Sequence, residues 1–217
     1  MPTERKEENR RMPREYEYAY CKSKVESFFK PSIPIVPFIP SHPKTPSRRL
    51  EVVSAWVGLE DLISDIIEKF NLGTKRCLEF GVEHGFSTVA LSSYFDSVTG
   101  VDIFTGDRHT NILKDIFEET KAKLAPYNNI QLIRSDYQDF IRTTDQTILY
   151  DLTHVDIIHT FADTYACGLW SAQHSTCTLF HDTESFPAVK HACIEVARAT
   201  GKRFYNYPKC FGLGIIV

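Results

Sequence analysis

The run CLEFGVEHGFST combines two carboxylates, two glycines and two hydroxyls within a short stretch of the chain. Gly81 permits a tight turn with close approach of the backbone, and Gly85 lets a ligand pass over the start of the following helix. The dinucleotide-binding pattern G-x-G-x-x-G needs a glycine where this chain has Glu83, which disfavours a nicotinamide cofactor. The carboxylate of Glu79 suits a cationic group instead, such as the ammonium of an amino acid.

Two further carboxylates follow at the ends of the next two predicted strands. Asp102, in VTGVDIF, is placed to bind the hydroxyls of a ribose. Asp136, in RSDY, can accept a hydrogen bond from the amino group of adenine. Ammonium, ribose and adenine together describe S-adenosylmethionine (SAM), so we predict a SAM site. The predicted binding residues are Glu79, Gly81, Gly85, Ser87, Asp102, Ile103, Asp136 and Tyr137.

The elements that must position these residues alternate from residue 51 onward. Strands are predicted at 76–80, 97–103, 130–134, 155–159, 176–180, 203–207 and 212–217. Helices are predicted at 52–70, around 89–94, and at 111–124, 137–144, 164–172 and 186–200. Alternation of this kind predicts an α/β, Rossmann-like, doubly wound sheet. The sheet is mostly parallel, with an antiparallel last strand, because no helix separates the final two strands.

The first 50 residues differ from the rest in composition and form a predicted arm before a domain at 51–217. The arm holds 11 Lys and Arg against 6 Asp and Glu, a net charge of +5; the remainder holds 14 against 22, a net charge of −8. Residues 1–14 are almost all polar and are expected to be disordered. Residues 15–30 can form a short helix or an extended segment. In the helix, one stripe would carry Tyr18, Cys21, Val25, Phe28 and Phe29.

Prolines recur at every third position from Pro31 to Pro46, which is the period of a polyproline II helix. Apolar residues stand between them, so we expect an arm that lies on a surface of its own domain or of a second subunit. The second case would make the protein a homo-oligomer. A solvated linker and a ligand for a proline-binding module are the alternatives.

Composition limits the class of protein. No stretch of the chain has the length and apolarity of a membrane span, and the first fifteen residues carry nine charges, unlike a secretory signal. The six cysteines form no C-x-x-C pair, which argues against a zinc cluster and a disulfide framework and favours a reducing, cytoplasmic setting. An acidic domain makes nucleic acid an unfavourable partner.

The chain resembles the class I SAM-dependent methyltransferases. LEFGVEHGFST is similar to their first motif and VTGVDIF to their second-strand acid. GVDIFTGD, the run LFHDT…FPAVKHA and the closing GLGII are similar to small-molecule O-methyltransferases of the macrocin and cephalosporin-biosynthesis type. The resemblance covers about residues 52–217. It implies transfer of a methyl group to a small or medium polar acceptor, most plausibly at oxygen.

The same resemblance implies a reaction site after the fourth and fifth strands of the domain. Relatives carry a motif like I-D-G-D-x-Y there and an acidic pair, which hold a magnesium ion. In HTFADTY, Asp163 and Tyr165 match, but Phe161 replaces the first acid, and HDT keeps only Asp182. Magnesium is therefore disfavoured. A softer divalent metal bound by His159, Asp163, His181 and Asp182 stays open.

These residues also suit acid–base chemistry. We expect His181 or His159 to take the proton of the acceptor hydroxyl, and Asp182 or Asp163 to orient that histidine. The alternative is that both histidines only cap strand ends. His84, inside the glycine turn, is expected to cover bound SAM. The departures from the acidic pattern leave a second function open: a catalytically degenerate SAM-binding protein with a role in assembly or regulation.

Overall fold

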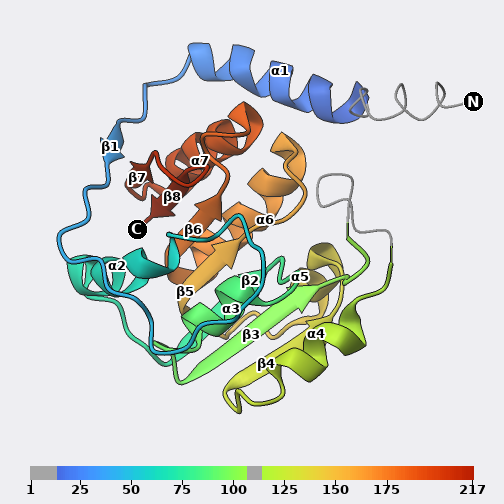
Figure 1. The fold of residues 1–217 in the computed structure, drawn as a ribbon. Coiled ribbons are helices and arrows are strands. Elements are labelled where there is room, and N and C mark those ends of the chain that lie inside the picture. The colour runs from blue at the N-terminus through green and yellow to red at the C-terminus, as the bar shows by residue number, and fades with distance from the viewer. Residues whose placement is uncertain (1–13, 107–113) are drawn as a thin grey trace, which may run out of the picture.

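A computed structural model describes residues 14–106 and 114–217, with side chains from residue 18 onward. One eight-stranded sheet crosses the molecule in the order β1-β7-β8-β6-β5-β2-β3-β4 (Figure 1). The strands are β1 (Ile35–Pro37), β2 (Arg76–Phe80), β3 (Ser97–Asp102), β4 (Ile130–Arg134), β5 (Tyr150–Val155), β6 (Ser175–His181), β7 (Phe204–Tyr207) and β8 (Leu213–Ile216). All neighbouring pairs are parallel except β6–β8 and β7–β8. The predicted Rossmann-like, mostly parallel sheet is therefore confirmed, and β8 is the antiparallel strand.

Helices cover both faces of the sheet. They are α1 (Arg14–Phe28), α2 (Ile63–Phe70), α3 (Phe86–Leu91), α4 (Phe117–Leu124), α5 (Tyr137–Thr143), α6 (Phe161–His174) and α7 (Pro187–Thr200). Successive strand residues point to opposite faces, so Cys77 of β2 joins a buried cluster with α2 and α3, whereas Leu78 joins one with α5, α6 and α7. The resulting three layers leave the carboxyl ends of the parallel strands open at one edge.

Two elements differ from the sequence prediction in ways that affect the site. The helix predicted at 52–70 begins only with a 3-10 turn at Glu60–Leu62, followed by α2. Gly58, with a φ of 94°, interrupts the helical conformation before that turn. The strand predicted at 155–159 lies instead at Tyr150–Val155. Residues 107–113, which include the start of the helix predicted at 111–124, lie outside the described residues, and α4 begins at Phe117.

The segment after α1 runs along the edge of the sheet. Ile35–Pro37 adds β1 in parallel to β7, at the outer edge where a proline is tolerated because no further strand needs its missing N–H. The next residue, Phe38, is buried in the cluster beside α2. Among the described residues, no helix combines the length and the apolar character needed to cross a bilayer.

Candidate active site

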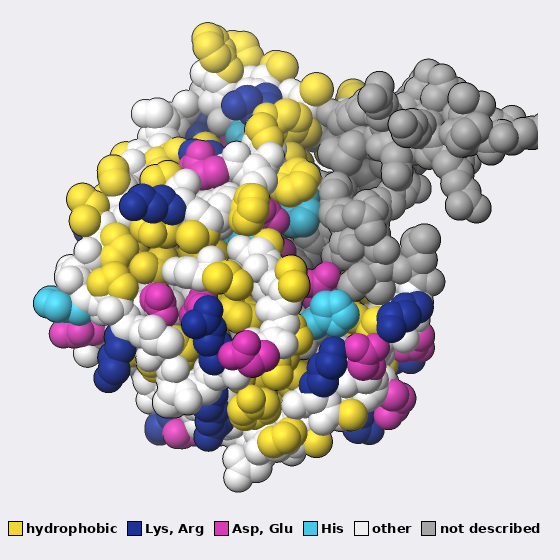
Figure 2. Space-filling view, in the orientation of Figure 1, with side chains coloured by type: hydrophobic (Ala, Val, Ile, Leu, Met, Phe, Trp, Pro, Cys, Tyr) yellow, Lys and Arg dark blue, Asp and Glu magenta, His cyan; other side chains and the backbone are white. Residues whose placement is uncertain are grey.

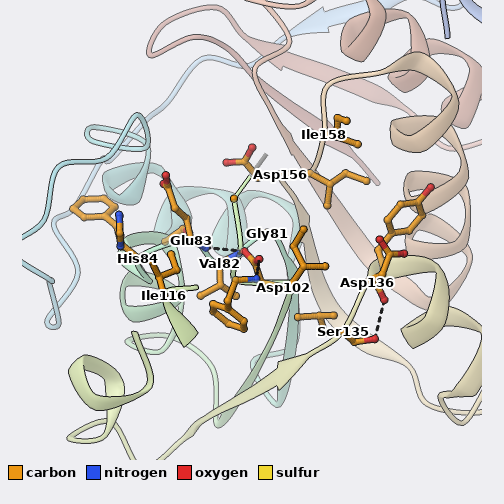
Figure 3. A pocket seen from close by; sticks show the side chains of 18 of the residues that line it. Gly81, Val82, Glu83, His84, Asp102, Ile116, Ser135, Asp136, Asp156 and Ile158 are labelled. Carbon is orange, nitrogen blue, oxygen red and sulfur yellow. Dashed lines mark hydrogen bonds between the residues drawn. The ribbon is translucent and has the colours of Figure 1, made fainter. Parts of the chain in front are cut away.

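A cavity of about 380 Å³ opens where β2, β3, β4 and β5 end. Its walls come from the turns that follow these four strands, together with residues 53–56 of the segment before α2. Figure 3 shows Asp102 beside the turn at Gly81–Glu83, with Asp136 and Asp156 on other sides of the cavity. Ser87, Ile103 and Tyr137 also line it, so six of the eight predicted SAM-binding residues line this one space, and Gly85 lies between the lining residues His84 and Phe86. The exception is Glu79.

The turn after β2 depends on its two glycines. Gly81 has a φ of 89°, and a Cβ there would lie 1.7 Å from the carbonyl oxygen of Asp156. Gly85 has a φ of 87° at the start of α3, and a Cβ there would meet Leu124 Cδ1 at 2.6 Å. At Gly81 the positive φ and the backbone contact both exclude a side chain, whereas at Gly85 the positive φ is the main obstacle because the Leu124 side chain can shift. The turn after β2 is thus packed directly against the turn after β5.

Asp102 holds the glycine turn through the backbone. Its Oδ2 accepts hydrogen bonds from the amides of Val82 (2.7 Å) and Glu83 (2.8 Å), and its Oδ1 accepts from the amide of Phe104 (2.6 Å). A carboxylate offers about four acceptor positions, so roughly one remains free to face the cavity. The carboxylate therefore shapes the turn itself, and a ribose hydroxyl would take the remaining position.

Asp136 and Tyr137 lie at the end of β4. The Asp136 carboxylate accepts from the amide of Gln138 at 2.7 Å and caps α5. The Tyr137 hydroxyl donates to Asp163 Oδ1 at 2.7 Å. Burial and the hydrogen bond to this carboxylate raise the pKa of Tyr137 well above its usual range, so it stays protonated. Asp136 is exposed and accessible from the cavity.

Glu79 is fully buried and lies behind the cavity wall. Its carboxylate accepts a hydrogen bond from Thr88 and contacts His154 Nδ1 at 2.9 Å. His154 Nε2 in turn accepts from the indole N–H of Trp56 at 3.1 Å, so the proton of the neutral ring lies on Nδ1 and is donated to Glu79. Glu79 therefore cannot contact an ammonium group in the cavity directly, contrary to the prediction from the sequence. Its negative charge lies under the turn, within a closed network.

Residues before α2 form a wall of the cavity that the sequence reasoning missed. Val53, Ser54 and Trp56 all line it. The apolar periodicity of this segment predicted a helix packed into the core, and Trp56 is indeed buried. Gly58 is the residue that could have indicated a loop before α2, because its positive φ interrupts a helix. His84, which is expected from the sequence to cover bound SAM, also lines the cavity, and burial lowers the pKa of its imidazole.

A cluster of two carboxylates and two imidazoles lies where β5 and β6 end. His159 Nε2 lies 2.9 Å from Asp182 Oδ2 and 3.6 Å from Asp156 Oδ1. His181 Nδ1 lies 3.1 Å from Asp156 Oδ2 and 3.4 Å from Asp182 Oδ2. The ring of Phe186 stacks on His159 with centroids 4.2 Å apart. Asp156 and His159 line the cavity, whereas His181 is buried behind Asp156.

Mutual attraction within this cluster shifts each pKa. Burial lowers the pKa of the two imidazoles, but hydrogen bonds and charges from Asp156 and Asp182 outweigh burial and raise His159 to about 9 and His181 to about 10. Burial likewise disfavours ionised carboxylates, but the two histidines lower the pKa of Asp182 to about 2 and that of Asp156 further. At neutral pH the cluster thus holds two imidazolium groups and two carboxylates.

The sequence prediction for this end of the site needs three corrections. Asp163 does not orient a histidine: its carboxylate is taken by Thr160 and Tyr137, and Thr160 caps α6. Asp156 occupies the place in the cluster assigned to Asp163. The cluster also lacks a histidine that could accept a proton at pH 7. The pKa values of His159 and His181 are both raised, so both rings are already protonated.

Three side chains of this cluster are of the types that bind divalent metal ions. Asp156, His181 and Asp182 bring ligand atoms within 4.8 Å of one another. Two carboxylates and one imidazole suit a borderline ion such as Mn²⁺, Fe²⁺ or Zn²⁺ better than they suit Mg²⁺, which prefers a shell of oxygen ligands only. His181 must first lose its proton, so binding would release protons to solution.

Comparison with known proteins supports the assignment of the domain. Residues 78–183 match the profile of a family described as a methyltransferase domain. This match covers the glycine turn, Asp102, Asp136 and both histidines of the cluster. The comparison with curated proteins gives no significant match.

Several solved methyltransferases share the fold. An O-methyltransferase from Bacillus cereus, solved with S-adenosylhomocysteine (SAH), is 12% identical, with a TM-score of 0.54 and coverage of 96% of this chain and 92% of its own. A SAM-bound amino pentose methyltransferase from Micromonospora echinaspora is 11% identical, with a TM-score of 0.55 and coverage of 75% and 91%. Fibrillarin from Aeropyrum pernix, with SAM bound, is 13% identical, with a TM-score of 0.54 and coverage of 82% and 88%. The profile match indicates a methyltransferase domain over residues 78–183, and the solved structures show that the chain shares the fold of methyltransferases that bind SAM or SAH.

Proposed function

We propose that the protein transfers the methyl group of SAM to an oxygen atom of a small or medium polar acceptor. One observation carries the proposal: a single cavity joins two chemically different ends. The cofactor end consists of the turn Gly81–Ser87 with Asp102 and Asp136. The acceptor end consists of Asp156 and His159, which line the cavity, and of His181 and Asp182, which lie behind them and pair with them.

At the cofactor end, we assign the adenine to the side of Asp136 and Tyr137 and the ribose to the free acceptor position of Asp102. The methionine part would cross the backbone at Gly81 and Gly85. The buried carboxylate of Glu79 places a negative charge beneath this turn, which favours the positively charged ammonium and sulfonium groups.

At the acceptor end, the acceptor oxygen attacks the methyl carbon, the carbon–sulfur bond breaks, and neutral SAH leaves. Positioning in line with the sulfonium supplies much of the acceleration. A carboxylate with a lowered pKa is a weak base, so Asp156 would not deprotonate an alcohol ahead of attack. The imidazolium of His159 instead stabilises an oxygen that carries negative charge. The cluster therefore favours acceptors whose oxygen ionises readily, such as phenols or carboxylic acids.

A divalent ion, when bound by Asp156, His181 and Asp182, would polarise the acceptor oxygen. The contributions of the chain itself do not depend on it. Asp156 and His159 orient the acceptor, Phe186 excludes water from one face of the His159 ring, and Asp182 keeps that ring charged. The imidazole of His181 in the donor set distinguishes this cluster from the oxygen-only magnesium site that the sequence resemblance implies.

The second candidate function is a SAM-binding protein without turnover, acting in assembly or regulation. It is favoured by the internal pairing of the acceptor end, in which each imidazolium is neutralised by a carboxylate. The six cysteines are all free thiols, which agrees with a reducing compartment for either function.

Calorimetric titration with SAM and SAH, followed by a turnover assay that measures SAH formed with phenols, carboxylic acids and sugars, tests both functions. Binding with turnover supports the enzyme, and binding without turnover on any acceptor supports the second function. Absence of binding contradicts both. In the Asp102→Ala variant we expect at least about 30-fold weaker SAM binding, corresponding to about 2 kcal/mol for lost charged hydrogen bonds.

A further inference from the structure

Helix α1 presents its apolar side chains to solvent. Tyr18, Val25 and Phe28 are 70%, 63% and 85% exposed, and Cys21 is also exposed. Figure 2 shows hydrophobic side chains gathered at the top of the molecule, where Figure 1 places α1. Soluble proteins usually bury the apolar face of a surface helix, so this orientation needs a physical reason.

Polar contacts hold the opposite face of α1 against the domain. Ser23 Oγ lies 3.0 Å from His191 Nε2, and Lys30, just after the helix, contacts Glu195 at 3.5 Å. Tyr20 packs edge-on against His191 with ring centroids 5.7 Å apart. These contacts join α1 to the first two turns of α7, so rotation of the helix to hide its apolar stripe would break them.

The exposed stripe has the spacing of a helix–helix seam. Tyr18, Cys21, Val25 and Phe28 follow one another at intervals of three, four and three residues. This is the a/d pattern of a seam between two paired helices. The intervals read the same in both directions, so an antiparallel copy of the same helix presents an identical series, with Tyr18 opposite Phe28 and Cys21 opposite Val25. A two-fold interface requires such self-complementarity.

The chain offers no apolar partner for this stripe in its own first residues. Seven of residues 1–13 are charged, and their apolar members are two methionines and two prolines. Lys22 and Lys24 flank the stripe, and two such helices would bring lysines near one another. That repulsion is a few tenths of a kcal/mol at exposed positions and is screened by salt.

We propose that α1 is a dimerisation helix that pairs in antiparallel fashion with α1 of a second copy of this chain, through the stripe Tyr18, Cys21, Val25 and Phe28. The stripe spans about 16 Å, so the dimer is reversible and its population rises with protein concentration. Tyr20 also packs on Phe161 at the start of α6, with ring centroids 6.4 Å apart. The pairing would therefore brace the helices that begin at the acceptor end.

Sedimentation velocity of the full chain over a wide concentration range tests the pairing. We expect a concentration-dependent monomer–dimer equilibrium, which the double change Val25→Glu and Phe28→Glu abolishes. The matched control is Leu149→Glu, which alters a 65% exposed leucine outside α1 and should leave the dimer intact. Both variants change exposed positions, so equal melting temperatures and SAM affinities confirm that they fold. A monomer at every concentration, or a dimer that survives the double change, overturns the proposal.

Disulfide trapping tests the orientation. The Val25→Cys variant should oxidise rapidly to a dimer that links the introduced thiol to Cys21 of the other copy. The unchanged chain should oxidise more slowly, because antiparallel pairing separates the two Cys21 residues by about 6 Å along the helix axes. Faster linkage through Cys21 alone indicates parallel helices and contradicts the antiparallel model.

One other occupant, a membrane surface, would give a different result. Sedimentation with vesicles of anionic phospholipid tests a membrane surface, since apolar and basic residues also suit one. Binding of a monomer to these vesicles, lost on the double change and weakened by salt, would replace the proposal. A dimer that persists or strengthens as salt rises supports it, because screening reduces the repulsion between Lys22 and Lys24 of the two copies.

Discussion

At the cofactor end of the cavity the backbone does most of the shaping, whereas at the acceptor end side-chain charges do. Gly81 and Gly85 fix the turn after β2 through φ angles and lack of room, and Asp102 secures it through three amides. The acceptor end consists of four ionised groups that hold one another in place. We therefore expect substitutions at the cofactor end to act mainly through space and backbone conformation, and substitutions at the acceptor end to act mainly through charge.

The largest effect is expected at the glycine turn. Gly81→Ala forces a Cβ against the carbonyl oxygen of Asp156 at 1.7 Å and strains a φ of 89°. We expect a loss of more than about 4 kcal/mol in the free energy of unfolding, measured by denaturant titration. Gly201→Ala is the control, since it has a φ of 71° but no atom within 4 Å, and should cost about 1 kcal/mol. Similar losses in the two variants would contradict the steric role of Gly81.

The second prediction separates the two ends by function. Asp156→Asn removes the charge that faces His181 and His159, so we expect turnover to fall at least about 100-fold, or about 2.7 kcal/mol, while SAM affinity changes little. Asp102→Asn should show the reverse order, with SAM affinity affected more strongly. Asp139→Asn, at an exposed ion pair with Arg142, is the control for both. Equal loss of SAM binding in the Asp156 and Asp102 variants would mean that the ends are not separate.

The pH dependence of turnover should reveal which form of His159 acts. If the imidazolium stabilises a charged acceptor oxygen, activity falls as pH rises through the His159 pKa of about 9. A neutral His159 acting as a base would instead make activity rise over the same interval. The pH–rate profile for a carboxylic acid acceptor, which is ionised throughout, isolates this effect.

Stability should follow the same groups. Folding raises the pKa of His159 to about 9 and of His181 to about 10, so their stabilisation is complete below pH 6.5, falls progressively as pH rises above that value, and is gone above about pH 10. Folding lowers the pKa of Asp182 to about 2, so its contribution is present above about pH 3.8 and is lost as pH falls to 2. Melting temperatures across the alkaline interval measure the histidine part. A melting temperature that does not change between pH 8 and 10.5 would contradict the ion pairs.

The smallest effect is expected behind the cofactor end. Trp56→Phe keeps an aromatic wall for the cavity but removes the hydrogen bond to His154 Nε2. We expect a loss of about 1 kcal/mol in the free energy of unfolding and a few-fold weaker SAM binding, because Glu79 is less well held. The calorimetric titration used for the other variants measures the second effect. Unchanged affinity would show that the network stabilises the fold without contributing to binding.

The sequence predicted the cofactor end more accurately than the acceptor end, for a local reason. Strands β2 and β4 begin and end at the predicted residues because polar or glycine-containing turns bound them. Strand β5 was misplaced because its buried side chains include Thr153 and His154, which obscure the apolar pattern. The partners of His154, Glu79 and Trp56, are distant from it in the sequence. The shifted strand hid Asp156, which follows β5 directly and completes the cluster.

Charge states were equally beyond reach from the sequence. A histidine is recognisable as a candidate base from its type, but its protonation depends on carboxylates that the fold brings from a neighbouring strand. His159 and Asp182 follow different strands, and only the parallel pairing of β5 with β6 places them 2.9 Å apart. The outward orientation of the apolar side chains of α1 could not be predicted from the sequence for the same reason. The polar contacts that fix this helix are with His191 and Glu195, which are distant in the sequence.

The position of Trp56 makes the protein its own optical sensor. The chain has two tryptophans, of which Trp56 lines the cavity whereas Trp170 packs against Phe80, Phe140 and His174. A change in the intensity or wavelength of the Trp56 emission would therefore report occupancy without a label, and the Trp56→Phe variant gives the background from Trp170. Screening of cofactor analogues would need only a fluorimeter.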